Sequence, residues 1–502
     1  MKQILFLTLS TLFVSVTALH IIFRNGQPMK QLFFLSAMTI CLSLASIQIP
    51  FWGIFLYYTF AVLRPQYLWK WALPVDVRWS LIAACVVIFS MAIHFNKILR
   101  ESKYTSMFSL IVVYSILLAG SMLVAFNPAV AQAWAIEYGK ILIIALIALL
   151  VINQVWQIRA MATMIFLCLG YIAWEINFLY FFRNGRLDIF HYGYGGMDNN
   201  GAGLMLAMGI PFAYYAAIST WERWGRAIFI IASGIGLCMV HSVMMSFSRG
   251  AMLAAIAGLL WVFLRHRSKK QAAALFVILT CAILFLSGSQ IRERFISTMD
   301  YKQDISAQSR FESWSAAWTI AWEHPLLGKG IRNSNIFSQN YGADYSGRTI
   351  HNQYLQIAAD SGVPAALLFI GLIGFSFYLC EKVRSECLYH LRRGMLSDKN
   401  MLQLDHIEKI CLAVQASLII FAVDSMFLSL EVFELPWVLF VISGVMPHSV
   451  RMLMKTCTED EKQLRSKHKT GPVRIPPRRR HHPEHGRMPL PTPSLMKPTK
   501  GL

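Results

Sequence analysis

Residues 310–330 read RFESWSAAWTIAWEHPLLGKG and residues 351–364 read HNQYLQIAADSGVP, and both lie in the one long polar stretch of an otherwise apolar chain. This stretch, from about Ser289 to Pro364, separates two apolar regions. A bilayer core cannot hold unpaired polar groups, so an integral membrane protein must place its chemistry in loops or at helix ends. The polar stretch therefore predicts a membrane domain built around one large loop, and it predicts a functional site in that loop.

The remainder of the chain has the composition of a polytopic membrane protein. Of its 502 residues, 56% are hydrophobic, against ~45–50% in soluble domains. The apolar runs predict an all-α fold with about 12 to 14 membrane crossings of ~20 residues each. The number is a range because Gln48 and Pro50 either split one of the runs into two segments or only kink it. The candidate segments are residues 3–23, 32–49, 51–63, 78–95, 107–125, 138–152, 160–182, 201–219, 227–246, 250–264, 273–288, 353–380, 410–428 and 435–449.

The positive-inside rule orients these segments. One alternating topology places the Lys- and Arg-rich turns in the cytoplasm, namely residues 97–103, 223–226, 265–270 and 382–399. The same topology places a second set of turns on the periplasmic face, namely residues 127–128, 183–200, 248–250 and 431–436, together with the large loop of about 289–352. The candidate functional residues then share the outer face of a membrane domain that spans residues 1–450.

Residues 451–502 form a basic tail. It holds thirteen Lys or Arg against four Asp or Glu, and it includes PPRRRHHPEHGRMPLPTPSLMKP. A charged, proline-rich segment cannot bury a core, so we expect this tail to be disordered. Because it follows a membrane segment, it is predicted to be cytoplasmic and to contact anionic membrane lipids, and no nucleic acid partner is expected.

The nine cysteines predict neither a metal centre nor a redox centre. No two of them form a CxxC pair, no group of Cys, His and carboxylate residues has zinc spacing, and none lies in the 289–350 loop. We expect them to be small buried residues, and we expect no metal or other cofactor.

The block at 310–330 predicts a helix that lies along the membrane surface. A capping box formed by Ser309 and Glu312 marks its start, and His324-Pro325 marks its end. A stripe of tryptophan on such a helix is typical of an anchor at the level of the lipid headgroups and needs no chemical role. The stripe consists of Trp314, Trp318 and Trp322.

Two arginines occupy positions suited to binding a phosphate, which a guanidinium holds through two parallel hydrogen bonds. Arg310 lies in the first turn of the surface helix, where its partner could also be an ordinary lipid phosphate. Arg249 lies in SFSRG between two apolar segments, where Ser248 and Gly250 allow close approach of the backbone. The alternative is an arginine at a helix end whose side chain extends to the membrane interface and has no chemical role. Because Arg249 breaks the positive-inside pattern, we favour a functional role.

His351 opens the segment that leaves the large loop. A neutral imidazole is well suited to take a proton from a hydroxyl near neutral pH. A single histidine in a membrane protein is often structural, and the expected closeness to Arg249 and Arg310 is what favours a catalytic role. The glycine-rich HYGYGGMDNNGAG (residues 191–203) could line a sugar site, but a turn that caps the next helix is the simpler interpretation.

Together these motifs resemble a known family. The FSRG turn, the RFESW helix that ends in HPLLGKG, and HNQYLQIAADSGVP are similar in order and spacing, over about residues 200–370, to the membrane domain of O-antigen ligases and O-antigen polymerases. PFWGIFLYYTFAVLRPQYLWKW (residues 50–71) and MDNNGAG resemble more narrowly the O-glycosylation ligases associated with exosortase systems in Gram-negative bacteria. Asp360 and Pro364 depart from the glutamate and glycine that are frequent in the last motif of the family.

The resemblance implies a metal-independent glycosyltransferase of the bacterial inner membrane. Its donor would be a glycan on undecaprenyl pyrophosphate, presented at the periplasmic face, and its acceptor would be a hydroxyl of a protein, a lipid or another glycan. Arg249 and Arg310 would bind the pyrophosphate, and His351 would activate the acceptor hydroxyl. The chemistry of the residues agrees, because fixed guanidinium groups stabilise a leaving group that gains charge in the transition state.

Two other functions stay open. A polymerase of the same fold would use a second lipid-linked glycan as its acceptor, and no motif in the sequence separates it from a ligase. A transporter or flippase for polysaccharide intermediates belongs to a different class, which tends to show internal repeats and ionisable residues near the bilayer midplane. Here the ionisable residues cluster on one face and the two halves show no obvious repeat, so we favour an enzyme.

Overall fold

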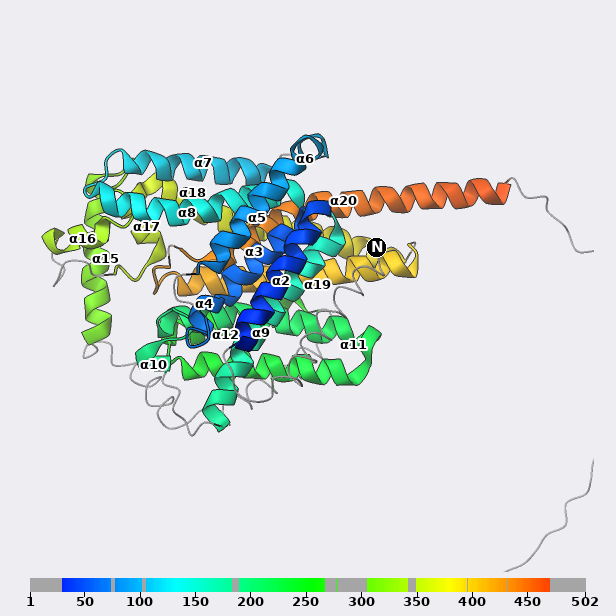
Figure 1. The fold of residues 1–502 in the computed structure, drawn as a ribbon, viewed down its shortest axis with the longest axis horizontal. Helices are drawn as coiled ribbons and strands as arrows, with labels where there is room; N and C mark the ends of the chain where they lie inside the picture. The colour runs from blue at the N-terminus through cyan, green and yellow to red at the C-terminus, as the bar shows by residue number, and fades with distance from the viewer. Residues whose placement is uncertain are drawn as a thin grey trace, which may run out of the picture. The chain divides into compact units, whose positions relative to one another are not determined.

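The computed structural model describes residues 29–73, 77–101, 105–182, 189–266, 277, 305–341, 349–394, 396–430 and 432–469. These residues are helical almost throughout, and the only strand-like pairing among them is an isolated bridge between Tyr194 and Met197. The all-α prediction is confirmed. Figure 1 shows the long helices running mostly along one direction, as expected of a bundle that crosses a membrane.

The helices follow one another through short connections. In the first half of the chain they are α2 (Met29–Gln48), α3 (Phe51–Leu63), α4 (Pro65–Leu68), α5 (Trp79–Ile93), α6 (Phe95–Glu101), α7 (Ser106–Met122), α8 (Pro128–Val151), α9 (Val155–Phe182) and α10 (Ile189–Tyr192). In the second half they are α11 (Asn199–Met245), α12 (Arg249–Arg265), α15 (Ile305–Glu323), α16 (Ser334–Phe337), η2 (Ser338–Tyr341), α17 (Gln353–Ser361), α18 (Val363–Arg393), α19 (Asp398–Asp424) and α20 (Glu434–Lys469).

Eight helices within the described residues are long and apolar enough to cross a membrane, and α5 and α7 are shorter apolar helices. The polytopic prediction is confirmed, whereas this part of the chain does not reach the predicted 12 to 14 crossings. Two predicted crossings, residues 3–23 and 273–288, lie outside the described residues. A third, residues 353–380, is not one helix: Gly362, at φ +90° and ψ +160°, separates α17 from α18.

The predicted crossings at 201–219 and 227–246 form a helical hairpin within the range of α11, as two separate spans, Asn199–Ser219 and Arg226–Met245. A Cβ built on Gly209 would lie 3.2 Å from Met239, and one built on Gly236 would lie 3.3 Å from Ala213. Contacts between residues so far apart in sequence require the two halves of α11 to pack side by side. Small residues allow this close approach of two helices in a membrane.

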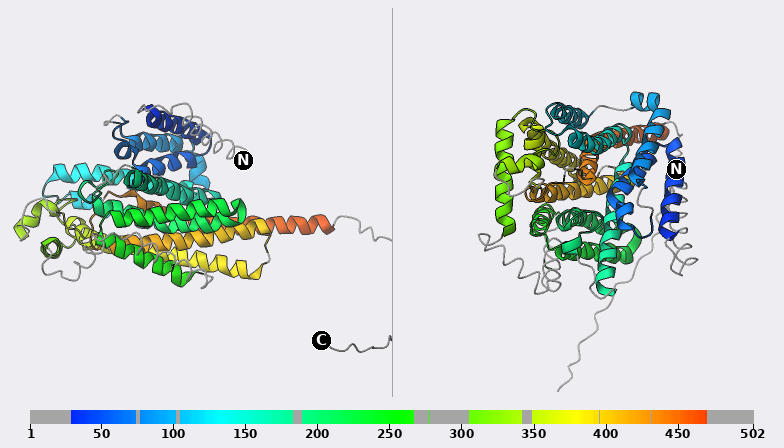
Figure 2. Two further views of the ribbon diagram at one scale, coloured as in Figure 1. Left: turned by 90° about the horizontal axis from the view of Figure 1, so that it is seen from below. Right: turned by 60° about the vertical axis from the view of Figure 1, so that its left-hand side comes forward.

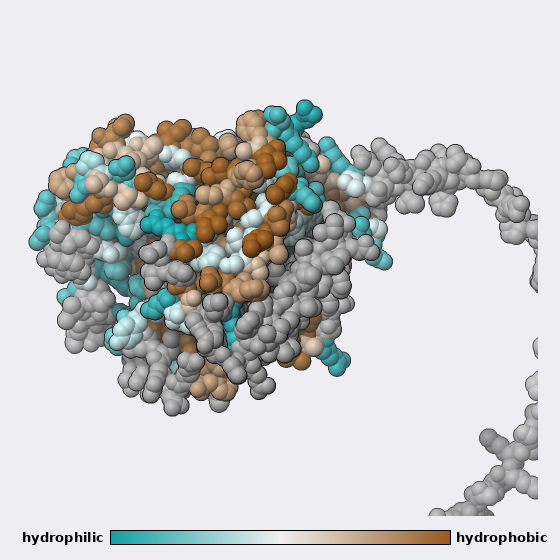
Figure 3. Space-filling model, in the orientation of Figure 1, coloured by the Kyte–Doolittle hydropathy of each residue, from teal (hydrophilic) through white to brown (hydrophobic). Residues whose placement is uncertain are grey.

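Helix α19 lies at the centre of the bundle and packs against α11, α12 and α18. A Cβ on Gly258 of α12 would collide with Ile420, so α12 and α19 touch almost backbone to backbone. Apolar side chains remain on outward faces, and Figure 3 shows them gathered over the side that carries α5 and α7. Ile88, Phe89 and Ile116 are more than half exposed, as expected of surfaces that meet lipid.

Helix α15 has a different direction from the bundle. It runs across the ends of α7, α8 and α18 instead of alongside them (Figures 1 and 2). This direction is the one expected of a helix along the bilayer surface, and that location stays a prediction. Its start differs from the prediction, because α15 begins at Ile305 and Ser309 already lies inside it.

The chain divides into two compact units, Met1–Lys455 and Thr456–Leu502. Helix α20 continues to Lys469, which corrects the expectation of disorder from Arg451 onward. The proline-rich part of the tail, from residue 470, lies outside the described residues.

Candidate functional site

Segments that are far apart in sequence meet at the end of the bundle that α15 covers. The backbone N–H of Asn127 donates to Asn333 Oδ1 (2.6 Å), joining the start of α8 to the residues that follow the HPLLGKG segment. The backbone N–H of Gln353 donates to the Ser425 carbonyl (2.8 Å), joining α17 to the end of α19. The turn at 127–128 and the large loop, both predicted to be periplasmic, therefore meet at this end of the bundle.

Asp360 holds the two motif blocks of the polar stretch together. Its carboxylate accepts from the Ser334 backbone N–H (2.8 Å) and from Gln356 Nε2 (2.7 Å), and its carbonyl accepts from the Gly330 N–H (2.8 Å). The residue is 2% exposed, and a buried polar group needs hydrogen-bond partners of this kind. Asp360 of the AADSG motif thus acts as a framework residue.

His351 is fixed by its neighbours on both sides. Its backbone is in the left-handed region (φ +57°), a conformation that costs a non-glycine residue about 1–2 kcal/mol. The carbonyl of His351 accepts from Trp314 Nε1 (3.3 Å), and the N–H of Asn352 donates to Ser429 Oγ (3.1 Å). The side chain of Asn352 then caps α17, so the imidazole is placed at the start of that helix and is half-buried.

Arg249 begins α12 after a tight turn. Ser248 caps the helix by accepting from the Ala251 N–H (3.3 Å), and Phe247 takes the left-handed conformation (φ +52°). Residues held in such conformations cluster at functional sites because the surrounding structure must enforce them. Of the four non-glycine residues with positive φ in the described part of the chain, Phe247 and His351 lie within two positions of a predicted site residue.

Asp424, the last residue of α19, lies where these pieces converge. A Cβ on Gly250 would lie 2.3 Å from Asp424 Oδ1, so the residue next to Arg249 packs directly on this carboxylate. Asp424 also interacts electrostatically with Arg310 and, repulsively, with Asp198. Trp314, one helical turn beyond Arg310 on α15, bonds to the His351 carbonyl. The structure thus brings Arg249, Arg310 and His351 to one region.

The Asp424 carboxylate is the one member of this region that the sequence analysis missed. It is 1% exposed, and its Oδ2 has no hydrogen-bond partner among the described residues. A buried carboxylate in that state is costly unless a cation compensates it, and the positive charge of Arg310 acts on this carboxylate. The signal was present in the sequence, because an ionisable residue inside a predicted crossing, here residues 410–428, is a functional hypothesis.

Comparison with known proteins identifies the region that carries these residues. Residues 234–370 match the family model described as O-Antigen ligase. The chain carries an O-antigen ligase domain. The matched segment contains Arg249, Arg310 and His351, while Asp424 and residues 1–233 lie outside it. A search of curated proteins gives no significant match.

The O-antigen ligase domain indicates a membrane enzyme of the glycan ligase or polymerase type, which uses a lipid-linked glycan donor and an acceptor. The narrower likeness to exosortase-associated ligases stays a prediction. Within the described residues, no group of three or more His, Cys, Asp or Glu residues is arranged to hold a metal ion.

The tryptophan stripe on α15 is only partly as predicted. Trp318 and Trp322 are exposed and stacked, with ring centroids 6.5 Å apart, as expected of a surface anchor. Trp314 instead turns inward, where it packs with Ala317 and Ile350 and lies 6.4 Å from the Phe427 ring. Because 3.6 residues make one turn, a strict four-residue spacing drifts around the helix, which carries Trp314 onto the buried side.

The glycine-rich segment at 191–203 forms a turn, in agreement with the simpler interpretation. Asp198 accepts from the Gly201 N–H (2.8 Å) and caps α11. Gly193, Gly195 and Gly196 have positive φ, a conformation that glycine adopts without steric cost. Asn199 Nδ2 donates to the Ser246 carbonyl (3.1 Å), so this turn braces the segment that leads into Arg249.

Tyr354 secures the first turn of α17. Its hydroxyl donates to the Ala422 carbonyl (2.9 Å), and burial raises the pKa of Tyr354 to about 12. The phenol therefore stays protonated at neutral pH and keeps donating to α19. This bond locks the helix that follows His351 to the helix that ends at Asp424.

Proposed function

We propose that the protein transfers an oligo- or polysaccharide from undecaprenyl pyrophosphate to the hydroxyl of a protein or lipid acceptor, at the periplasmic face of the bacterial inner membrane. The observation that carries the proposal is the convergence of two arginine-bearing segments and the His351 segment around the buried carboxylate of Asp424. The O-antigen ligase domain supports the reaction class.

Arg249 and Arg310 bind the donor pyrophosphate. Both side chains are half-buried, so each is partly desolvated and still reachable. The pyrophosphate gains negative charge as the glycosidic bond breaks, and fixed guanidinium groups therefore stabilise the transition state more than the ground state. Asp424 is a positioning residue in this scheme, because its carboxylate acts on Arg310 and contacts the backbone beside Arg249.

His351 acts as the general base. The acceptor oxygen forms a bond to the anomeric carbon, while the bond from that carbon to the pyrophosphate oxygen breaks and its electron pair leaves with the pyrophosphate. The acceptor proton passes to the His351 imidazole. An attack from the side opposite the leaving group inverts the configuration of the anomeric carbon, and a base held at a fixed helix start contributes typically 10²–10⁴-fold to such a step.

A polymerase would perform the same bond changes with a second lipid-linked glycan as acceptor. The test is an incubation of purified protein with undecaprenyl-pyrophosphate-linked glycan and three acceptors presented separately: a protein, a lipid and a second lipid-linked glycan. Transfer to the protein or the lipid supports a ligase, and chain growth on the second glycan supports a polymerase. Movement of intact donor between vesicle leaflets without any transfer would replace both with a transporter.

A further inference from the structure

A polar cavity lies at the end of the bundle opposite Asp424. Its volume is about 730 Å³, and it is bounded by the end of α12, the last turns of α18 and the first turn of α19. Helix α12 begins at Arg249 and ends at Arg265, so the two ends lie about 24 Å apart along its axis. The cavity is therefore separate from the site around Asp424.

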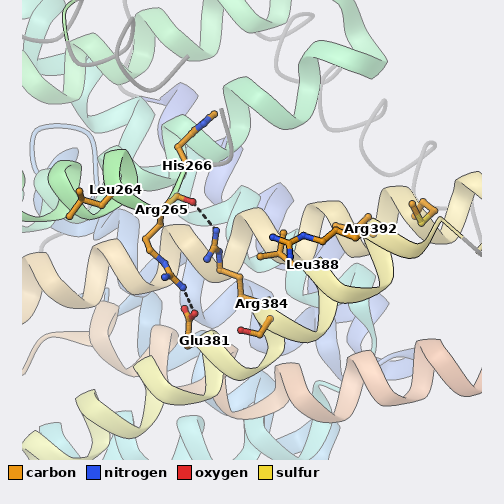
Figure 4. Close-up of a pocket in the computed structure, with 10 residues that line it drawn as sticks. Leu264, Arg265, His266, Glu381, Arg384, Leu388 and Arg392 are labelled. Carbon is orange, nitrogen blue, oxygen red and sulfur yellow. Dashed lines mark hydrogen bonds and ion pairs between the residues drawn. The ribbon is translucent and has the colours of Figure 1, made fainter. Parts of the chain in front are cut away.

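The lining combines cationic and apolar side chains. Figure 4 shows Arg265, His266, Arg384 and Arg392 around the cavity, with Leu264 and Leu388 beside them. Leu264 is 54% exposed, so an apolar surface continues outward from the cationic one. Arginine and leucine at the end of a membrane bundle suit a ligand with an anionic head and a hydrocarbon body.

Two ion pairs account for part of this charge. Arg384 pairs with Glu408 (2.9 Å), and their side chains are 5% and 4% exposed, so this pair belongs to the protein interior. Arg265 pairs with Glu381, whose other oxygen accepts from Gln415 Nε2 (3.0 Å). The three arginines against the two glutamates leave one positive charge at the cavity, and a phosphodiester carries one negative charge.

We propose that this cavity binds the phosphate of an anionic phospholipid headgroup. Arg392, which is exposed, and the outer side of Arg265 contact the phosphate, and the Ser385 hydroxyl at the cavity wall donates to it. The acyl chains pass over Leu264 into the surrounding lipid. This assignment does not depend on the proposed transferase reaction.

The test uses the full-length protein purified in a non-ionic detergent. It is mixed with dioleoylphosphatidylglycerol, with dioleoylphosphatidylcholine or with inorganic phosphate, and lipid bound per protein is measured by native mass spectrometry together with the thermal unfolding temperature. We expect phosphatidylglycerol to bind and to raise the unfolding temperature, and we expect phosphatidylcholine and inorganic phosphate to have no effect.

Matched variants locate the binding in the cavity. Ser385→Glu adds a negative charge to the wall without removing a member of either ion pair and should weaken phosphatidylglycerol binding about tenfold, while Ser385→Gln should not. Arg392→Gln should weaken binding about fivefold. Arg393→Gln is the control, because the Arg393 guanidinium lies over the Tyr389 ring, 4.4 Å from its centroid, and outside the cavity.

Three results would overturn the assignment. Ser385→Glu could bind phosphatidylglycerol as tightly as the native chain, or Arg393→Gln could weaken binding as much as Arg392→Gln. Inorganic phosphate could also give a stabilisation that Ser385→Glu abolishes, in which case the cavity takes a free phosphate and not a lipid.

Discussion

The substitution Gly250→Ala isolates the contact between the Arg249 turn and Asp424. The new methyl carbon would lie 2.3 Å from Asp424 Oδ1, whereas ordinary contacts of a Cβ begin at 3.4 Å. The Asp424 carboxylate, the turn or the end of α19 must therefore move by about 1 Å, and a displacement of that size at a reacting centre can cost about 100-fold in rate. Alanine is otherwise favourable near the start of a helix, by up to ~1 kcal/mol over glycine.

The expected result is a loss of transfer of about 100-fold with little change in thermal stability. The assay is the initial rate of undecaprenyl pyrophosphate release by purified protein. Gly371→Ala is the matched control, because nothing lies within 4 Å of a Cβ at that position in α18. Near-native activity of Gly250→Ala would refute the reasoning that packing against Asp424 positions Arg249.

A double-mutant cycle separates the clash from the loss of the carboxylate. Asp424→Ala removes the group with which the new methyl collides, so Gly250→Ala should add little further loss in the Asp424→Ala background. If the two losses simply multiplied, the contact would not be the cause.

Three further predictions concern other parts of the account. Arg310→Lys should lower transfer about 100-fold in the same assay, because lysine keeps the charge but loses the planar fork that binds a phosphate at two points; native activity would show that only charge matters. Asp360→Ala should lower the free energy of unfolding by about 3 kcal/mol, because Ser334 and Gln356 lose a buried partner. Thermal unfolding measures the change, with the exposed Asp398→Ala as the control. An unchanged unfolding temperature would contradict the framework role. Deletion of the chain after Lys455, where the first compact unit ends, should leave transfer largely unchanged, and complete loss would assign the tail a role in the reaction.

Much of the fold follows from the sequence because the bilayer permits few alternatives. Lipid requires every backbone polar group to be paired within a segment, so long apolar runs must be helices, and α3, α5, α7, α9 and α12 follow the predicted segments closely. The break at Gly362 was not predicted, because the predicted crossing at 353–380 included the more polar residues before it together with the apolar run after it. It depends on the tertiary contact in which the Val363 N–H donates to the Pro325 carbonyl (2.8 Å).

The candidate site follows from the sequence only in part. The order of the motifs predicted that Arg249, Arg310 and His351 lie at one end of the bundle, since alternating crossings return their turns to the same face. Asp424 was missed although an ionisable residue in the predicted crossing at 410–428 is itself a signal, because a single carboxylate does not show what lies next to it. Its partners, Gly250 and Arg310, come from other helices. A local sequence pattern does not show which residues of distant helices lie close together.

The central claim is that His351 takes the acceptor proton in a glycan transfer. The most direct measurement compares the native chain with His351→Ala, both purified and shown to be folded, in the presence of undecaprenyl-pyrophosphate-linked glycan and an acceptor. The account predicts that the native chain releases undecaprenyl pyrophosphate and forms a glycosylated acceptor, and that His351→Ala loses at least 100-fold of this rate while its donor binding stays near native. Transfer by His351→Ala at the native rate would contradict the account.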